Sequence, residues 1–526
     1  MLLLSKSFFT MIKELTQRPY KKEIRKVEGI PIDKEWEKPI SFTRIKEDLS
    51  RSSDIVFRNF ILRGKEEIPC VLGVVDGLVD KHLLDSYVLR VIMVDAINDP
   101  AFRAITMDTI HDRLLELFTP ANEVKKVSRM GEAIDAMLSG DAVLFIEESQ
   151  EALVISARGW ENRGVTAPQN ESSIRGPKEG FNETLRTNTS LLRRRIKHPS
   201  LRLVSMKIGD LSKTDVVIAY IENVARADVV AEVLRRIGRI QINGVISGDI
   251  LEELIEDHPY SPFPQVYNTE RPDIVASDLL EGRVAIIVDG TPSVLIVPVT
   301  MAKFMQVNED YYERAMIVVL IRSVRYWGAF IAVLAPSLYI AVTTFHQELI
   351  PTSLALSISA GRDAVPFSAL GEALLMLLAL EILQEAGLRL PKPIGQTIGI
   401  VGALIIGDAA VKASLISPIM VIVIGLTAVS SYTIPSYDLA MGIRLIRLPL
   451  MILAGTMGFF GLGVGLYLVL IHVLGLRSFG TPYLSPIAPL RIRAFLQDTF
   501  VRAPWWASRK IPELVDTHDP KSGGKK

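Results

Sequence analysis

The C-terminal half of the chain carries long apolar runs separated by short polar stretches. A helix that spans a bilayer needs about 20 mostly apolar residues in a row. Runs that reach or approach this length occupy residues 326–347, 366–388, 393–411, 413–435 and 448–476. The pattern therefore predicts an all-α polytopic membrane domain over residues 315–476, with about five apolar segments.

The N-terminal part shows shorter apolar runs, which are typical of strands, and these runs occur twice. The sequence LSGDAVLFIEESQEALVI at 138–155 matches LEGRVAIIVDGTPSVLIV at 280–297 with a constant offset of 142 residues. Further upstream, VLGVVDGLVD from Val71 resembles VIAYIENVAR from Val217. We expect each copy to contain a short helix end, an apolar strand, a polar turn and a second strand.

The repeat predicts an α+β soluble N-terminal region that consists of two related α/β subdomains. Their expected bounds are 50–157 and 200–310, and the pair Asp289-Gly290 is a strong hairpin signal in the second copy. Residues 1–50 are expected to form a basic, partly disordered extension without a cleavable signal peptide.

A basic polar linker, 158–199, separates the two copies. From Arg175 to Arg202 it has eight basic and two acidic residues, and a helix is predicted over 179–197. Because arginine can bind carboxylates with two parallel hydrogen bonds, we expect contacts between subdomains or subunits here. A solvated linker helix is the alternative. The candidate contact residues are Arg175, Lys178, Arg193, Arg194, Arg195 and Lys197.

Composition and motifs exclude several functions. The chain has 59 basic and 59 acidic residues, which argues against binding nucleic acid through bulk charge. The single cysteine, Cys70, excludes intrachain disulfides, thiolate zinc sites and iron–sulfur clusters. Nucleotide-binding GxxxxGK[ST] and metal-binding HExxH motifs are absent from the sequence. We expect no enzymatic activity, no cofactor and no bound metal.

The segment 366–388 is apolar but contains Glu372, Glu381 and Glu385. Carboxylates in a spanning helix are costly unless they face protein or water, so they are functional candidates. Glu381 and Glu385 share a helix face, whereas Glu372 lies roughly opposite, so one polar stripe cannot include all three. The alternative for Glu385 is an interfacial pair with Arg389.

The next segment, 393–411, is short and rich in glycine. Small residues at helical spacing usually indicate close helix packing, and a pore lining is the other interpretation. Asp408 and Lys412 are four residues apart and could form an ion pair within the membrane. The candidate pore or intramembrane polar residues of this segment are Gln396, Gly399, Ala403, Gly407 and Asp408.

The basic residues that flank the apolar segments predict a cytoplasmic N-terminal region. The tail at 477–526 is also basic, with nine basic and four acidic residues, whereas five complete crossings would place it outside. The expectation is therefore that one segment, 393–411, is re-entrant or does not cross fully.

Several stretches are specific enough to indicate a family. They include PQNESSIRGPKEGFNETLRTNTSLLRRRIKHPSLRL at 168–203, NGVISGDILEELIED, SPFPQVYNTERPD, LRLPKPIGQTIGIVGALIIGDAAV and FLQDTFVRAPWW. Together they resemble the GerA family of spore germination proteins from about residue 50 to 510. The resemblance implies the A subunit of a nutrient germinant receptor in the inner spore membrane, with its N-terminal domain on the spore-core side.

The resemblance also implies partners. These are a transporter-like B subunit, a lipoprotein C subunit, membrane lipid, and further copies of the chain that assemble, as a pentamer, into a ligand-gated cation channel. A paralogous stage-V sporulation membrane protein of the same family, acting as an auxiliary channel, and a non-conducting membrane scaffold remain alternatives. A transporter is disfavoured because the apolar segments show no inverted repeat.

Overall fold

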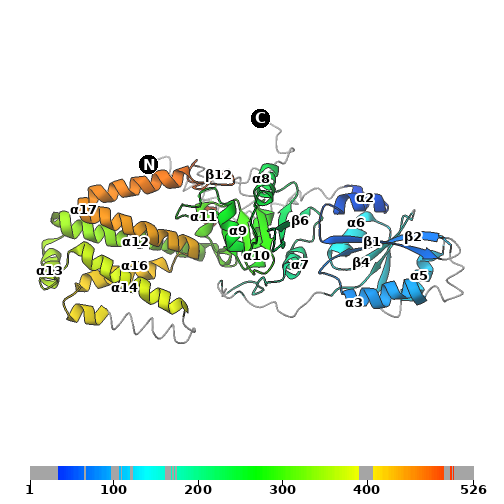
Figure 1. Cartoon of the computed structure of the whole chain (residues 1–526), viewed down its shortest axis with the longest axis horizontal. Helices are drawn as coiled ribbons and strands as arrows, with labels where there is room; N and C mark the ends of the chain where they lie inside the picture. The colour runs from blue at the N-terminus through cyan, green and yellow to red at the C-terminus, as the bar shows by residue number, and fades with distance from the viewer. Residues whose placement is uncertain are drawn as a thin grey trace, which may run out of the picture. The chain divides into compact units, whose positions relative to one another are not determined.

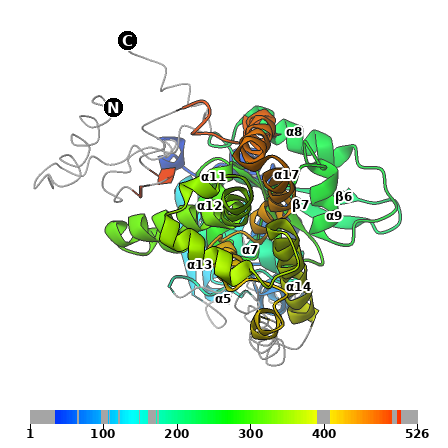
Figure 2. The same cartoon turned by 90° about the vertical axis from the view of Figure 1, so that its left-hand side faces the viewer.

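The computed structural model describes residues 34–63, 67–95, 106–107, 109–118, 123–147, 149–159, 168, 171, 175–389, 407–490, 498–499 and 501–502. The chain divides into two compact units (Figures 1 and 2). We call Met1–Glu256, Val266–Pro298 and Trp505–Lys526 the sheet unit. Asp257–Gln265 and Val299–Pro504 form the helical unit.

The sheet unit contains two five-stranded sheets of the same strand order. The first runs β1 (Ile55–Arg63), β2 (Glu67–Val75), β4 (Ala142–Ile146), β5 (Ala152–Ile155), β3 (Val124–Val127). The second runs β6 (Leu201–Ile208), β7 (Thr214–Ile221), β9 (Val284–Val288), β10 (Val294–Val297), β8 (Tyr267–Thr269). Neighbouring strands pair antiparallel in both sheets.

The repeated sequence positions occupy equivalent places in the two sheets. Strands β4 and β9 are separated by the same 142 residues as the matched sequences, and so are α6 (Met130–Leu138) and α10 (Pro272–Leu280). Every residue of β4 and β9 is buried, since helices or loops cover both faces, and this explains why these strands are continuously apolar.

Helices pack on both faces of the first sheet. Ile45 and Leu49 of α2 (Phe42–Leu49) join α6 in one apolar core, so the folded region begins before residue 50. The opposite core contains α5 (Ile110–Phe118) and short helical turns. These turns are α3 (Lys81–Leu83), η2 (Leu84–Leu89) and η3 (Val91–Asp95).

The predicted linker helix is shorter than expected and belongs to the second core. Helix α7 covers Leu185–Arg195, and its leucines pack with α10 against β7 and β9. Residues before it are not helical because the Asn188 side chain exchanges two hydrogen bonds with the Asn182 backbone, at 2.9 and 2.6 Å. Asp289 of the predicted hairpin accepts a hydrogen bond from the first backbone N–H of α7, at 3.1 Å. The second subdomain also includes α8 (Ala227–Gly238) and α9 (Gly248–Ile255).

One buried arginine joins the two sheets. Arg193 of α7 is fully buried, and its Nε and Nη2 atoms each lie 3.0 Å from an oxygen of Asp54, which precedes β1. Its Nη2 also donates to Ser52 Oγ at 3.0 Å. Ser53 N donates to Leu203 O of β6 at 2.8 Å, so this loop covers part of the β6 edge. The joint is a polar network satisfied without water.

The helical unit contains long apolar helices. They are α12 (Ala315–Phe345), α13 (Thr352–Arg362), α14 (Ala369–Arg389), α16 (Pro418–Ser431) and α17 (Tyr437–Gly475). Among the described residues, α12 and α17 are long and apolar enough to cross a membrane by length and composition. The short elements of the helical unit are α11 (Met301–Phe304), η5 (Asn308–Tyr311), η6 (Gln347–Leu349), β11 (Arg477–Ser478) and β12 (Thr481–Pro482). The sheet unit has one further short element, η1 (Lys34–Glu37), which packs against α6.

Helix α17 is a hairpin rather than one rod. Its Gly458 has φ 65° and ψ −140°, a conformation that favours glycine and reverses the helix direction. A Cβ on Gly461 would lie 2.2 Å from Leu453 O, although eight residues separate them, so the halves 437–457 and 459–475 run antiparallel in contact. Figure 1 draws both halves in orange.

Both ends of this hairpin meet one loop. Gly442 of the first half lies so close to Pro262 O that a Cβ would come within 2.1 Å, and His472 of the second half lies 2.9 Å from Ser261 Oγ. The turn packs against Phe345, at the C-terminal end of α12. We call this the far end of the helical unit and the end at Ala315 the near end.

The chain after α17 returns to residues that precede α12. Met301 N donates to Tyr483 O at 2.8 Å. The expected single span at 448–476 is therefore replaced by two antiparallel helices, each about 25–30 Å long at 1.5 Å per residue. The hairpin brings the start of the tail back to the near end. Most of the segment 393–411 lies outside the described residues, so its re-entrant course stays a prediction.

The hairpin predicts the labelling pattern of single cysteines in sealed vesicles. Tyr437→Cys and Arg477→Cys should react with an impermeant maleimide from one side, and Met457→Cys from the other, together with Ser353→Cys. Burial raises the pKa of the native Cys70 thiol to about 12, so that thiol should stay silent. Labelling of residues 437 and 477 from opposite sides would show a continuous helix.

The joint between the sheets predicts a large stability loss in Arg193→Leu. Removing the guanidinium leaves Asp54 buried without its partner, which costs about 3–5 kcal/mol. Arg194→Leu is the matched control, because Arg194 is partly exposed and 3.7 Å from Glu179, and it should cost less than about 1 kcal/mol. Thermal unfolding of the full chain measures both; equal shifts in Tm would contradict this role of Arg193.

Candidate functional site

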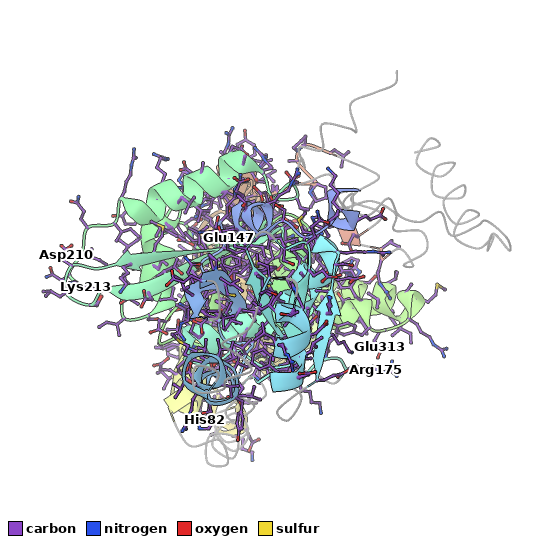
Figure 3. All side chains as sticks on the ribbon, turned by 90° about the vertical axis from the view of Figure 1, so that its right-hand side faces the viewer. His82, Glu147, Arg175, Asp210, Lys213 and Glu313 are labelled. Carbon is purple, nitrogen blue, oxygen red and sulfur yellow. The ribbon has the colours of Figure 1, made fainter. Side chains whose placement is uncertain are left out.

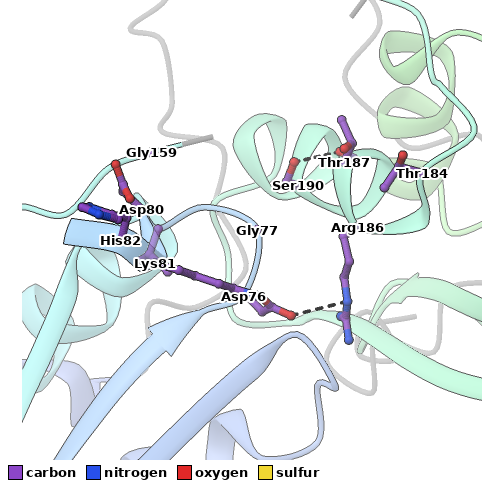
Figure 4. Close-up of a pocket in the computed structure, with 11 residues that line it drawn as sticks. Asp76, Gly77, Asp80, Lys81, His82, Gly159, Thr184, Arg186, Thr187 and Ser190 are labelled. Carbon is purple, nitrogen blue, oxygen red and sulfur yellow. Dashed lines mark hydrogen bonds and ion pairs between the residues drawn. The ribbon is translucent and has the colours of Figure 1, made fainter. Parts of the chain in front are cut away.

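A polar pocket of about 470 Å³ lies beside the joint of the two sheets. It is formed by the turn after β2, the start of α3 and one face of α7 (Figure 4). Asp76 lies at its centre, with Lys81 Nζ at 3.0 Å and Arg186 Nε at 3.4 Å from its two oxygens. Gly77, with φ +91°, makes the turn that presents Asp76.

The pocket is lined by hydroxyl groups and by charged side chains. Hydroxyl groups of Thr184, Thr187 and Ser190 line one wall, and Asp80 and His82 line another. Ser190 Oγ donates to Thr187 O at 2.7 Å and has no base beside it among the described contacts. Mixed charges and hydroxyls fit a small polar molecule. In the described part of the chain, no three His, Cys, Asp or Glu side chains are placed to hold a metal ion.

The remaining linker candidates stay predicted contact residues. Arg195 binds Glu179 at 2.7 Å, within the same segment. Arg175, Lys178 and Lys197 are exposed; Figure 3 labels Arg175, as well as His82 of the pocket. Among the six basic candidates, Arg193 makes contacts that connect the subdomains, through Asp54 and Ser52.

A carboxyl group on the second sheet titrates near neutrality. Glu171 accepts a hydrogen bond from Thr269 Oγ1 at 2.6 Å, and burial raises its pKa to about 7. Because the pKa of Glu171 is higher in the folded chain than in the unfolded chain, protonation of Glu171 stabilises the fold. This contribution to the free energy of unfolding is fully present below about pH 4.5 and is lost as the pH rises through about 7.

Glu372 of α14 contacts two neighbouring helices within the helical unit. It is fully buried, its Oε2 accepts the backbone N–H of Ser417 at 2.9 Å, and its Oε1 lies 3.2 Å from Arg362 Nη2. Glu372 thus stabilises the N-terminus of α16 and pairs with the last turn of α13.

Glu381 connects α14 to the first half of α17. Its two oxygens lie 3.7 Å from Arg444 Nη1 and 3.6 Å from Arg447 Nη2. Glu385 lies one turn further along α14 and is exposed. The carboxylates predicted to share a face therefore differ in environment, because the two arginines of α17 meet Glu381.

The glycine-rich segment is described only from Gly407 onward. The ion pair that the spacing of Asp408 and Lys412 predicts is present, with Lys412 Nζ 2.6 Å from Asp408 Oδ2. Both side chains are largely exposed. Gly407 is buried. Gln396, Gly399 and Ala403 lie outside the described residues.

A second buried cluster at the near end was missed by sequence reasoning. Arg322 of α12 is fully buried, and its Nε donates to Asp310 at 2.9 Å. Arg322 also donates to Asp498 O in the tail, and Tyr311 donates to the Asp498 carboxylate at 2.8 Å. Arg502 donates to Tyr311 O at 3.1 Å. Burial raises the pKa of Asp498.

The available signal for this cluster was the motif FLQDTFVRAPWW, which contains Asp498 and Arg502. Local spacing could not reveal the pairing, because Arg322 and Asp498 are 176 residues apart. The cluster holds the start of the tail at the first turns of α12, and Tyr326 OH adds a hydrogen bond to Thr499 O at 3.2 Å.

Comparisons with known proteins agree with the sequence motifs. The family model described as "Bacillus/Clostridium GerA spore germination protein" matches residues 43–514. Spore germination protein KA of Bacillus subtilis is 41% identical over 91% of this chain and 87% of its own length. Spore germination protein GerLA of Bacillus cereus is 38% identical over 90% of this chain and 95% of its own length.

Two further comparisons concern a protein named as a membrane protein and a solved structure. A B. subtilis protein named uncharacterized membrane protein YfkQ is 41% identical over 93% of this chain and 94% of its own length. This name and the two long apolar helices indicate membrane association. Among solved structures, the N-terminal domain of the A subunit of the Bacillus megaterium spore germinant receptor GerK3 is 35% identical, with TM-score 0.39, covering 49% of this chain and 92% of that chain.

The resemblance predicted from the motifs is thereby confirmed over nearly the whole length. Relatives with about 40% identity over about 90% of the chain are named as spore germination proteins, and the family model spans most of the sequence. The chain belongs to the GerA family of spore germination proteins.

Proposed function

We propose that this protein is the A subunit of a spore nutrient germinant receptor. The observation that carries the proposal is the similarity to spore germination proteins over about nine-tenths of the chain. The proposed location is the inner spore membrane, with the sheet unit on the spore-core side. Basic residues at the near end of the helical unit, including Arg314 and Arg325, support that orientation.

The proposed assembly contains a transporter-like B subunit, a lipoprotein C subunit and several A subunits. In it, A subunits form a ligand-gated cation channel as a homo-oligomer, with a pentamer as the expected size. A ring of copies would place one residue of each subunit around a common axis, where small or acidic side chains control cation passage.

The pore element in this proposal is the segment 393–411, not the paired carboxylates of α14. Glu372 and Glu381 each meet an arginine within the same chain, so they hold helices together. Glycine and alanine permit helices to approach a symmetry axis closely. The pore residues we propose are therefore Gln396, Gly399, Ala403, Gly407 and Asp408, with Glu385 as the remaining acidic candidate.

The pore assignment predicts a block by added bulk. Ala403→Leu should reduce cation flux from liposomes that contain the purified chain to about one-tenth or less, because the added atoms narrow a ring of small side chains. Ala360→Leu, on the exposed face of α13, is the control. The same liposomes test the function itself: if the wild-type chain gives no flux with or without its partner subunits, the scaffold alternative replaces the channel.

Glu372→Gln is predicted to lower protein abundance rather than conductance per channel. The substitution leaves Arg362 facing a neutral group in a buried site, which costs several kcal/mol. Glu348→Gln, the same change at an exposed position near the far end, should leave abundance unchanged. Immunoblots of spores beside potassium release separate the two effects. A well-expressed Glu372→Gln protein with reduced release would instead make Glu372 a conduction residue.

A further inference from the structure

A groove of about 400 Å³ lies between α14 and the first half of α17. One side chain at its base is unusual for a helical unit associated with a membrane. Arg447 is only 3% exposed, and within the described chain its Nε meets no hydrogen-bond acceptor. A buried guanidinium nitrogen without an acceptor is costly, so it points to a ligand that the described part of the chain does not supply.

The charges around the groove do not balance. Arg444 and Arg447 share one carboxylate, Glu381, at 3.7 and 3.6 Å, distances too long for hydrogen bonds. Glu381 is 42% exposed, whereas the two arginine side chains are 15% and 3% exposed. The part of the groove beside the two arginines is therefore positive and can accept an anion that offers two oxygens.

The walls of the groove are apolar and face outward. Leu378 is 59% exposed and Leu445 is 60% exposed, on opposite sides of the opening. These side chains could contact an acyl chain above the two guanidinium groups. A free inorganic anion would make no use of such walls, but an amphiphile from the surrounding bilayer would fill both parts.

The proposed orientation places the groove toward the cytoplasmic side of the helical unit. Arg444 is less than one helical turn from Gly442, which contacts the loop at Pro262 at the near end. Basic pockets between membrane helices on the cytoplasmic side commonly bind anionic headgroups.

We propose that this groove binds an anionic phospholipid, with its phosphate on Arg444 and Arg447 and its acyl chain between Leu378 and Leu445. Glu381 then acts as a competing internal anion that the phosphate displaces from the two arginines. The inference rests on membrane association and does not depend on whether the protein conducts ions.

The test is a titration of the purified full chain, in neutral detergent, with phosphatidylglycerol that carries a fluorescent acyl chain. Arg444→Gln should weaken binding about tenfold or more, since a charge-assisted hydrogen bond is lost. Glu381→Gln should strengthen binding about threefold, because it removes the competing carboxylate. These opposite signs cannot both result from misfolding, which circular dichroism and gel filtration check in each variant.

Arg477→Gln is the matched control, because it removes an exposed cation from the same unit and should leave the affinity unchanged. Unlabelled phosphatidylglycerol should compete, whereas phosphatidylcholine should not. Equal competition by both lipids, or an unchanged affinity of Arg444→Gln, would overturn the proposal. Displacement by millimolar inorganic phosphate would identify a site for free anions instead. Binding confined to monomers would show that a second copy covers the groove in the assembly.

Discussion

The arrangement of this molecule depends on arginines that are removed from water and must meet an anion there. Arg193 and Arg322 are both fully buried, and each is bound by the carboxylate of a residue distant in fold or sequence. Burying a guanidinium is tolerable only with near-complete pairing, so each pair fixes the elements that carry it. The first pair joins the two sheets, and the second joins the tail to α12 through Asp310 and Asp498.

Much of the sheet unit could be predicted because its signals are local. Strands β4 and β9 are buried on both faces and therefore read as continuous apolar runs, and the Asp289-Gly290 turn marks a hairpin. The repeat then gave the equivalence of the sheets, although not their strand order. The bounds of helix α7 were less predictable. Arg193 interrupts its apolar face, and the helix begins later than predicted because the Asn188 side chain binds the Asn182 backbone.

The helical unit was harder to predict, because an apolar run indicates how long a helix can be but not where the chain reverses its direction. The run 448–476 has the composition of one spanning helix, and its glycines are equally compatible with helix packing. Only the positive φ of Gly458 and the contact between Gly461 and Leu453 distinguish a hairpin from a rod. Such tertiary contacts produce no periodic pattern in the sequence. The intramembrane carboxylates could be predicted as polar sites, but not their partners, since Glu372 meets Ser417 and Arg362 through the fold.

The internal pairing of these carboxylates limits how the helical unit could attract cations. A carboxylate with an arginine at 3.2 Å contributes little net field, so Glu372 attracts cations only weakly. The surroundings of Glu381 are positive rather than negative, because two arginines face its single carboxylate. Any cation selectivity must then come from groups outside these pairs. Among the candidate carboxylates, Asp408 is also paired, with Lys412 at 2.6 Å. A conducting assembly would therefore depend less on a bare acidic ring than on how symmetry-related copies bring small residues and backbone carbonyls together.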